Sequence, residues 1–557
     1  MFVKKINLYI FLIVFLIACS AFLLPNHHVP WRTAYQDFLM YAVFIILIFK
    51  ILINSRDIII DWKIIIVFLI SYIPLIQGFL GKIFFFGDAI IAFIYVFSLA
   101  IAILIGCNLR RNIEIEKIMF FISSILVVCC LISAYFCLSQ WLLIADNNFW
   151  IVKVDVGQRP YANFGQPNNF ASFLLIGLLA TVYLYEKKVI NLFSIVLLSS
   201  LIIFCISLTQ SRTAWLYGII FVIWWLWKSR NFNTRLNKYS SICFFVILIS
   251  SSISISYISS AVDILPVNDL VTRATTGYLR LPMWYQMILA IWDQPWFGYG
   301  WNQVSVAQIS IFQEYPTTEW IEHSHNIILD LVIWNGIPLG IFISVFYIYW
   351  LWQLSKLAVS IENFIILSMM GVLLVHGNLE FPLEYAYFLL PCGLFLGLVH
   401  YDNKINFIRF SSRLGLCFLG GFVVVYTWIF VEYKIIEKEV ELSRFSALGI
   451  NSLDIESNID GIVLLTQLKE NVINLRTLPR ENMSDEQMDL MRDIAYRYGT
   501  SSNLYRYALA LAFNNQDTSA KHYLEILNKL HKKNENLNSL YLLKDSLSSH
   551  QQMDLKQ

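Results

Sequence analysis

EWIEHSHNIILDLVIWNGIPLG, residues 319–340, joins a polar run to a long apolar segment. The polar run contains His323 and His325 and ends at Asn326, and the apolar segment extends over residues 327–350. An apolar segment of this length can cross a bilayer as a helix. The sequence therefore predicts a histidine-bearing polar cluster at a membrane surface, at the end of a spanning helix. Such a cluster is well placed for chemistry on a lipid-linked substrate.

The rest of the chain has the composition of a membrane protein. Of its 557 residues, 58% are hydrophobic and only 14% are charged, which excludes an ordinary soluble globular protein. Apolar runs of spanning length recur to about residue 432, so we expect an all-α fold, a polytopic transmembrane helical bundle. The net charge of +2 gives no indication of nucleic-acid binding, and membrane lipids are the expected surroundings. The thirteen predicted spans cover residues 7–24, 38–53, 64–80, 90–107, 118–138, 169–186, 190–208, 214–228, 241–260, 326–350, 363–380, 385–400 and 414–432.

The distribution of Lys and Arg predicts the orientation of the spans. If the N-terminus is cytoplasmic, most basic residues before residue 433 fall in inner loops, as the positive-inside rule requires. Thirteen spans then place the C-terminus outside. Two long loops, at about 139–168 and 261–325, lie on the same outer side as the short TQSRT turn and the HGNLEFPLEY loop. The polar clusters of the membrane part therefore face one compartment.

The composition changes after Val431, where charged residues recur at helical spacing. We expect a transmembrane domain over residues 1–432 and a small soluble helical domain over residues 433–557. Residues 503–533 read as two amphipathic helices that resemble one tetratricopeptide-type hairpin. Docking of a partner and simple packing are both open roles for this domain.

His325 is the candidate catalytic residue. A neutral imidazole can accept a proton, and an alcohol needs such a base to become a good nucleophile. Two other interpretations stay open: His325 could cap a helix, or it could pair with His323 on a metal ion, with Glu319 and Glu322 as further ligands. The nine cysteines contain no CxxC pair, and we expect neither a metal site nor a cofactor.

Three arginines, Arg159, Arg212 and Arg280, lie on the predicted outer side. A guanidinium group matches the oxygens of a pyrophosphate in a bidentate manner, and an arginine at membrane depth indicates function. The alternative is ordinary snorkelling toward the membrane surface.

The stretch YANFGQPNNFASFLL, residues 161–175, contains Gly and Pro residues that predict an irregular backbone. The side chains of Gln166, Asn168 and Asn169 would then be able to form hydrogen bonds. We expect a helix to begin with Asn169 as its N-cap, and the N-terminus of a helix attracts anions. A plain loop with a capped helix is the alternative.

A second polar stretch, EFPLEYAYFLL, brings Glu380, Glu384, Tyr385 and Tyr387 toward the same outer surface. Glutamates at the start of a helix often only cap it, and tyrosines there often belong to the interfacial aromatic belt.

These motifs together resemble a known family. His325 and Asn326 are followed by nine residues and then Gly336, a spacing that resembles the signature of the O-antigen ligase superfamily. With the FGQPNN loop, the SRTAW junction, the EFPLEYAYFLL stretch and the C-terminal extension, the chain looks like the PglL-type protein O-oligosaccharyltransferases. The resemblance covers most of the membrane part.

The resemblance implies roles for individual residues. His325 matches the essential histidine, and Arg212 and Arg280 match arginines expected to hold the pyrophosphate. Gln166 takes the place of the loop glutamine, and Tyr385 that of a functional tyrosine. Arg159 and Asn326 complete the candidate substrate-binding residues.

The expected function follows from this resemblance. It implies a metal-independent enzyme of the bacterial inner membrane, with its active site facing the periplasm. The donor would be a glycan on undecaprenyl pyrophosphate, and the acceptor a Ser or Thr hydroxyl of an exported protein, with pilin as one candidate. Transfer to lipid A-core and polymerisation of O-antigen units are alternatives within the superfamily. A transporter or flippase is disfavoured, because its polar residues should lie near the bilayer midplane.

Overall fold

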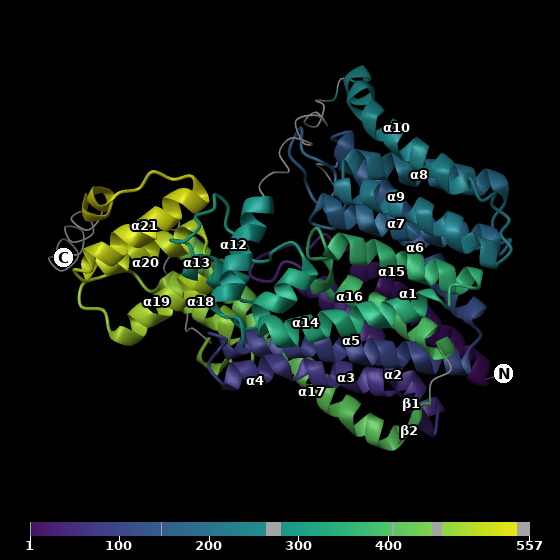
Figure 1. The fold of residues 1–557 in the computed structure, drawn as a ribbon, viewed down its shortest axis with the longest axis horizontal. Helices are drawn as coiled ribbons and strands as arrows, with labels where there is room; N and C mark the ends of the chain where they lie inside the picture. The colour runs from purple at the N-terminus through teal and green to yellow at the C-terminus, as the bar shows by residue number, and fades with distance from the viewer. Residues whose placement is uncertain are drawn as a thin grey trace. The chain divides into compact units, whose positions relative to one another are not determined.

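The computed structural model describes residues 2–145, 148–262, 264, 280–403, 406–447 and 459–542. Its regular structure is almost entirely helical (Figure 1). The helices are α1 Phe2–Leu23, α2 Ala34–Asn54, α3 Trp62–Ser71, α4 Ile73–Phe79, α5 Phe86–Asn112, α6 Ile115–Trp141, α7 Pro167–Glu186, α8 Leu192–Thr209, α9 Arg212–Lys228, α10 Ser240–Ala261, α12 Arg280–Asp293, α13 Val304–Ser310, α14 Ile327–Ser355, α15 Ile361–Gly377, α16 Ala386–His400, α17 Ser412–Ala447, α18 Thr466–Arg476, α19 Asp485–Arg497, α20 Ser501–Phe513 and α21 Asp517–His531.

The chain forms two compact units, each built from three separate stretches of sequence. The first unit comprises Met1–Ser71, Ile94–Gly277 and Phe346–Thr427, and the second comprises Tyr72–Phe93, Tyr278–Val345 and Trp428–Gln557.

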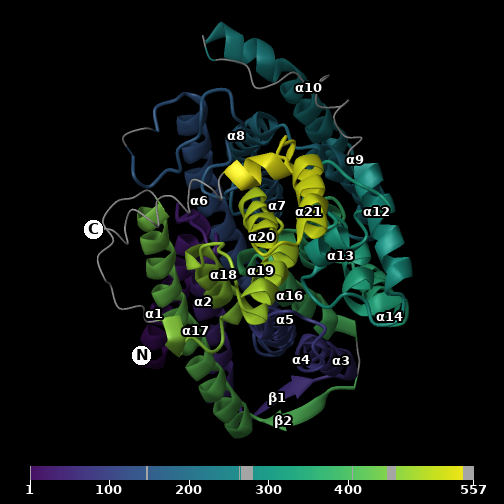
Figure 2. The ribbon, with the colours of Figure 1, turned by 90° about the vertical axis from the view of Figure 1, so that its left-hand side faces the viewer.

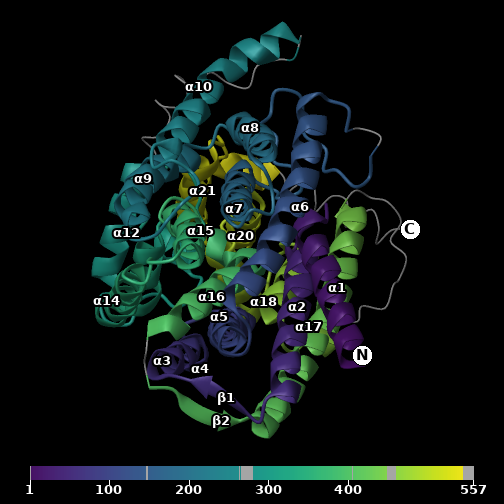
Figure 3. The same cartoon turned by 90° about the vertical axis from the view of Figure 1, so that its right-hand side faces the viewer.

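In the first unit, α7 is the central helix. It packs against α6, α8 and α15, as Figure 3 shows, and most of its residues are buried. A helix that is apolar all round needs such a position. A short antiparallel pair of strands, β1 Asp57–Ile60 and β2 Ile408–Ser411, joins distant parts of this unit, with Asp57 opposite Ser411.

The second unit contains the C-terminal helices. α18, α19, α20 and α21 pack in sequence, each against the next (Figure 2). Their hydrophobic core includes Ile309 and Phe312, which lie in and just after α13. The helices at the C-terminus therefore share a core with the segment that leads to the histidines.

The predicted fold class, an all-α membrane protein, is confirmed. Every predicted span overlaps a helix of the structure. The span predicted over residues 64–80 corresponds to two consecutive helices, α3 and α4. Nine helices in the described part of the chain are long and apolar enough to cross a membrane. The number of thirteen spans and their orientation stay predictions.

The predicted division of domains also stays a prediction. Residue 432, the expected end of the membrane domain, lies inside α17, which continues without a break to Ala447. Of the predicted outer loop at 261–325, residues 263 and 265–279 lie outside the described residues.

Candidate functional site

The polar run at residues 319–326, called the histidine run from here on, ends where the capped helix α14 begins. The Asn326 side-chain oxygen, Oδ1, accepts hydrogen bonds from the backbone N–H groups of Ile328 and Leu329, each at 3.1 Å. This is the geometry of an N-cap, which satisfies amides that the first turn leaves unpaired. Asn326 thus fixes the start of α14, and a contact between Asn326 and substrate stays a prediction.

His325 has an unusual backbone conformation just before this cap. Its φ of 57° lies in the left-handed region, which side chains other than Gly seldom adopt. Such conformations persist where the surroundings enforce them, and they concentrate at functional sites. The side chain of His325 is partly exposed, whereas that of His323 is buried. Of the two histidines, His325 is therefore the one that a substrate can reach.

Two polar contacts hold the residue between the histidines. The backbone N–H of Ser324 donates to Asp330 Oδ1 at 2.8 Å, and its carbonyl oxygen accepts from Trp284 Nε1 at 2.8 Å. Asp330 is buried in the first turn of α14. Asp330 therefore has a structural role, since its carboxylate fixes the backbone between the two histidines.

Gly336, which closes the signature, lies at a break in α14. Its φ of 75° and ψ of 171° are not helical. The carbonyls of Ile333 and Trp334 instead accept from the backbone N–H groups of Tyr299 and Gly300, at 2.9 and 3.1 Å. A Cβ at this position would lie 2.8 Å from the backbone nitrogen of Phe297. Glycine is therefore required both by conformation and by the close approach of another chain segment.

Arg280 is the first described residue of α12, which is described over Arg280–Asp293. Trp284 follows it by four residues, so the two side chains lie on the same face of the helix. Because Trp284 bonds the carbonyl beside His325, Arg280 lies on the face of α12 that is turned to the histidine run.

The other candidate residues lie in the first unit, around the start of α7. The helix begins at Pro167 with Gln166 as its N-cap, so the prediction that Asn169 is the N-cap is wrong. Proline fits the first helical position, because its φ is already helical and the missing N–H has no partner there in any case. Gln166, and not Asn169, therefore occupies the N-cap position of α7.

The side chains of Gln140 and His27 fix the loop before α7. The side chain of Gln140 donates to the carbonyls of Val152 and Ala162 and accepts from the N–H groups of Tyr161 and Ala162, at 2.7–3.0 Å. His27 Nε2 lies 2.8 Å from the carbonyl oxygen of Asn163. Burial lowers the pKa of His27, so its ring is neutral at neutral pH.

Arg159 and Arg212 both lie at the turn between α8 and α9. Arg159 donates from Nη1 to the carbonyl oxygen of Thr209, the last residue of α8, at 3.2 Å. Gln210 follows in a left-handed conformation, and the exposed Arg212 begins α9. A guanidinium at a helix N-terminus opposes the helix dipole. The charge of Arg212 and the positive end of α9 together favour an anion.

Asn168 links three predicted polar stretches. Its side-chain oxygen accepts from Ser211 Oγ at 2.8 Å, and its Nδ2 donates to Glu380 Oε1 at 3.3 Å. The structure thus brings together the FGQPNN loop, the SRTAW junction and the EFPLEY stretch, and the prediction that they face one compartment stays a prediction.

Tyr385 is the N-cap residue of α16, and its ring stacks on Tyr387 at 5.4 Å. The neighbouring N–H of Ala386 donates to Asp37 Oδ1 at 2.8 Å. Asp37 is buried and also accepts hydrogen bonds from Thr33, Trp31 and Tyr95.

Asp37, which fixes the start of α16 beside Tyr385, was not among the residues predicted from the sequence. The sequence did contain a signal for Asp37. It is an acidic residue in the first turn of the apolar helix α2, and a carboxylate in a membrane helix costs free energy, so it is expected to have a function.

Within the described residues, no group of three or more His, Cys, Asp or Glu side chains is arranged to hold a metal ion. The alternative metal site at Glu319, Glu322, His323 and His325 thus has no structural support, and metal independence stays a prediction. The roles of the seven candidate site residues also stay predictions.

Comparison with known proteins adds three family matches. A family described as O-Antigen ligase matches residues 195–344, which include Arg212, Arg280, His325 and Asn326. One described as Protein glycosylation ligase matches residues 160–185, which include Gln166. One described as Virulence factor membrane-bound polymerase, C-terminal, matches residues 364–540.

Two relatives are similar along most of the chain. A "General O-oligosaccharyltransferase" of Acinetobacter baylyi is 31% identical over 536 residues, which cover 93% of this chain and 92% of that protein. A "ComP-specific O-oligosaccharyltransferase" of the same organism is 29% identical over 498 residues, which cover 88% of this chain and 89% of that protein.

Proposed function

This chain belongs to the family of O-oligosaccharyltransferases, and we propose that it transfers an oligosaccharide from an undecaprenyl-pyrophosphate carrier to a Ser or Thr hydroxyl of an exported protein. The chain is a membrane protein, and we place its reaction on the periplasmic face of the bacterial inner membrane. A lipid-linked glycan donor and a protein acceptor follow from the family. Undecaprenyl as the lipid carrier, the inner membrane as the location and pilin as a possible acceptor are parts of the proposal.

One observation supports this proposal most directly. His325 is partly exposed, has a left-handed backbone conformation and directly precedes the cap of a helix of spanning length. It therefore presents an imidazole at the end of a membrane helix, where the reactive end of a lipid-linked glycan would lie.

In the proposed reaction His325 accepts the proton of the acceptor hydroxyl. The hydroxyl oxygen then attacks the anomeric carbon of the donor sugar, and the bond between that carbon and the pyrophosphate oxygen breaks. Negative charge grows on the departing pyrophosphate, which fixed positive groups stabilise. The products are the glycosylated protein and the carrier pyrophosphate.

Arg212 and Arg280 are the proposed ligands of the pyrophosphate. Arg212 begins α9, and a helix N-terminus carries partial positive charge that adds to the guanidinium. Arg159, which bonds the turn just before Arg212, would orient this turn and add to its positive charge.

Reconstitution tests the proposal. The purified enzyme in liposomes, given an undecaprenyl-pyrophosphate oligosaccharide and an exported acceptor protein, should raise the mass of a Ser- or Thr-containing peptide by that of the glycan. A parallel reaction with lipid A-core as acceptor should give no product. Transfer to lipid A-core alone, or lengthening of the donor glycan alone, would contradict the proposal.

A further inference from the structure

The polar run that contains His325 is held from its N-terminal side by α13. Gln308 is fully buried. Its Nε2 donates to the carbonyl oxygen of Glu319 at 2.8 Å, and its Oε1 accepts from the N–H of Ile321 at 3.1 Å. One side chain of α13 therefore fixes the backbone on both sides of Trp320.

Trp320 connects this run to the C-terminal helices. Its Nε1 donates to Ser305 Oγ at 2.7 Å, and Ser305 Oγ donates to the carbonyl oxygen of Tyr496 at 2.7 Å. Ser305 is fully buried. A Cβ on Gly499 would lie only 2.9 Å from Cδ1 of Trp320, so the indole packs directly against the backbone that follows α19.

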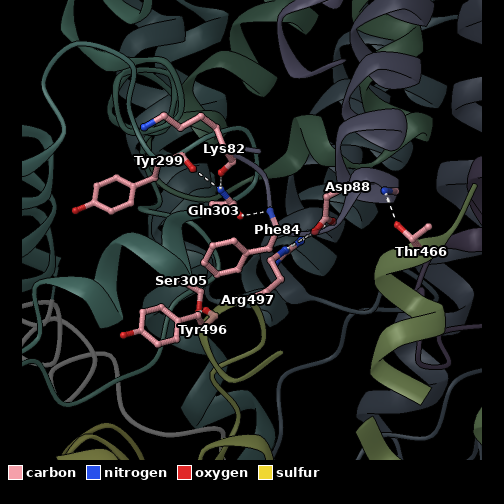
Figure 4. Close-up of polar contacts among 10 residues, drawn as sticks. Lys82, Phe84, Asp88, Tyr299, Gln303, Ser305, Thr466, Tyr496 and Arg497 are labelled. Carbon is pink, nitrogen blue, oxygen red and sulfur yellow. Dashed lines mark hydrogen bonds and ion pairs between the residues drawn. The ribbon is translucent and has the colours of Figure 1, made fainter. Parts of the chain in front are cut away.

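A buried ion pair fixes the same end of α19. Arg497 donates from Nε and Nη2 to the two carboxylate oxygens of Asp88, at 2.8 and 3.0 Å. The side chains are only 12% and 6% exposed, so the pair is largely removed from water. One residue earlier, the N–H of Gly87 donates to Thr466 Oγ1 at 2.7 Å. Figure 4 shows Arg497 pointing toward Asp88 and Ser305 beside Tyr496.

Arg497 keeps its charge in this buried position. Burial alone would lower the pKa of Arg497, but the charges of Asp88 and, more weakly, Glu322 raise it above its usual value. Arg497 therefore stays charged beside Asp88.

We propose that the C-terminal helices position His325. In this account Arg497 anchors the end of α19 to Asp88, and Trp320 connects residues 319–325 to that end of α19. The position of residues 319–325 then sets the direction of the His325 imidazole. Ser305, Trp320 and Arg497 are positioning residues, since they act through His325. The inference rests on the proposed role of His325 and gives the C-terminal helices a part in catalysis beyond capping the fold.

Two substitutions test this inference in the full-length enzyme. Ser305→Ala removes the hydroxyl that links Trp320 to Tyr496. Trp320→Phe keeps an aromatic ring but removes the N–H donor. Each should lower kcat for transfer by about tenfold or more, because a small misplacement of a catalytic group is costly, and should leave KM for the donor unchanged. Ser310→Ala is the control, since its hydroxyl donates to the carbonyl oxygen of Val306 within α13, and kcat should not change.

The decisive comparison is made in a His325→Ala background. If Ser305 acts through His325, adding Ser305→Ala to His325→Ala should lower the residual transfer no further. An equal loss with and without His325 would overturn the inference, and so would wild-type kcat for both positioning variants. As a check of folding, each detergent-solubilised variant must elute from a size-exclusion column at the same volume as the wild-type enzyme. If Ser305→Ala fails this check, Trp320→Phe provides the same comparison. Normal transfer by His325→Ala alone would instead refute the proposed role of His325 as the base, and a wild-type enzyme that transfers no glycan to protein would refute the proposed function, so these failures are distinguishable.

Discussion

Gly336→Ala is expected to destabilise the fold around the histidine run. Gly336 has φ 75° and ψ 171°, a region that is open almost only to glycine and costs other residues about 1–3 kcal/mol. The added Cβ would also meet the backbone of Trp296 and Phe297. These atoms cannot move away without disturbing the segment that enters the break in α14.

The size of the effect follows from two contributions. The bonds from Tyr299 N to Ile333 O and from Ile337 N to Pro295 O, at 2.9 and 2.7 Å, hold this segment in place. Losing both would cost about 1–3 kcal/mol at the usual net value of a hydrogen bond. With the conformational strain, the free energy of unfolding should fall by about 2–6 kcal/mol.

Thermal unfolding of the purified protein in detergent measures this change. The apparent melting temperature of Gly336→Ala should fall clearly below that of wild type. The matched control is Gly371→Ala, which lies within α15, where its Cβ would be 3.6 Å from Tyr217. Alanine is the better helix former by about 1 kcal/mol, so this variant should melt at or above the wild-type temperature. A wild-type melting temperature for Gly336→Ala would refute the explanation of the signature glycine.

Three further outcomes are expected. Arg212→Ala and Arg280→Ala should each weaken binding of the pyrophosphate donor, measured by titration of the purified enzyme, and unchanged donor affinity in both would contradict the assignment. Activity should persist in excess EDTA, and a loss that added divalent metal restores would show a metal requirement. Alkaline phosphatase fused after residue 433 should be active and after residue 404 inactive, and the reverse pattern would overturn the predicted orientation.

The sequence predicted the helices well, because apolar runs of spanning length have few other structures available. It assigned the three polar stretches around Asn168 to one side of the membrane, and their hydrogen bonds to one another are a finding of the structure. The start of α7 was predicted wrongly, at Asn169, although a local signal was present: the proline after Gln166 favours a helix that begins at Pro167.

Other features depend on contacts between residues far apart in the chain, which no local pattern shows. The break in α14 at Gly336 needs the backbone around Phe297 to fill it. Asp37 fixes the start of α16 from a helix near the N-terminus. Residue 432, the expected domain boundary, is a buried Glu whose carboxylate accepts hydrogen bonds from the N–H groups of residues 463–465. Glu432 thus joins α17, which continues to Ala447, to the segment just before α18.

The relative importance of the two histidines is the most direct test of the central claim. Transfer should be measured with purified His325→Ala and His323→Ala in liposomes, at matched amounts of correctly folded enzyme. His325→Ala should lower the rate by about 10²–10⁴-fold, the range for a positioned general base, and His323→Ala, which removes a buried side chain, should cost much less. Near-normal transfer by His325→Ala, with loss in His323→Ala, would contradict the account.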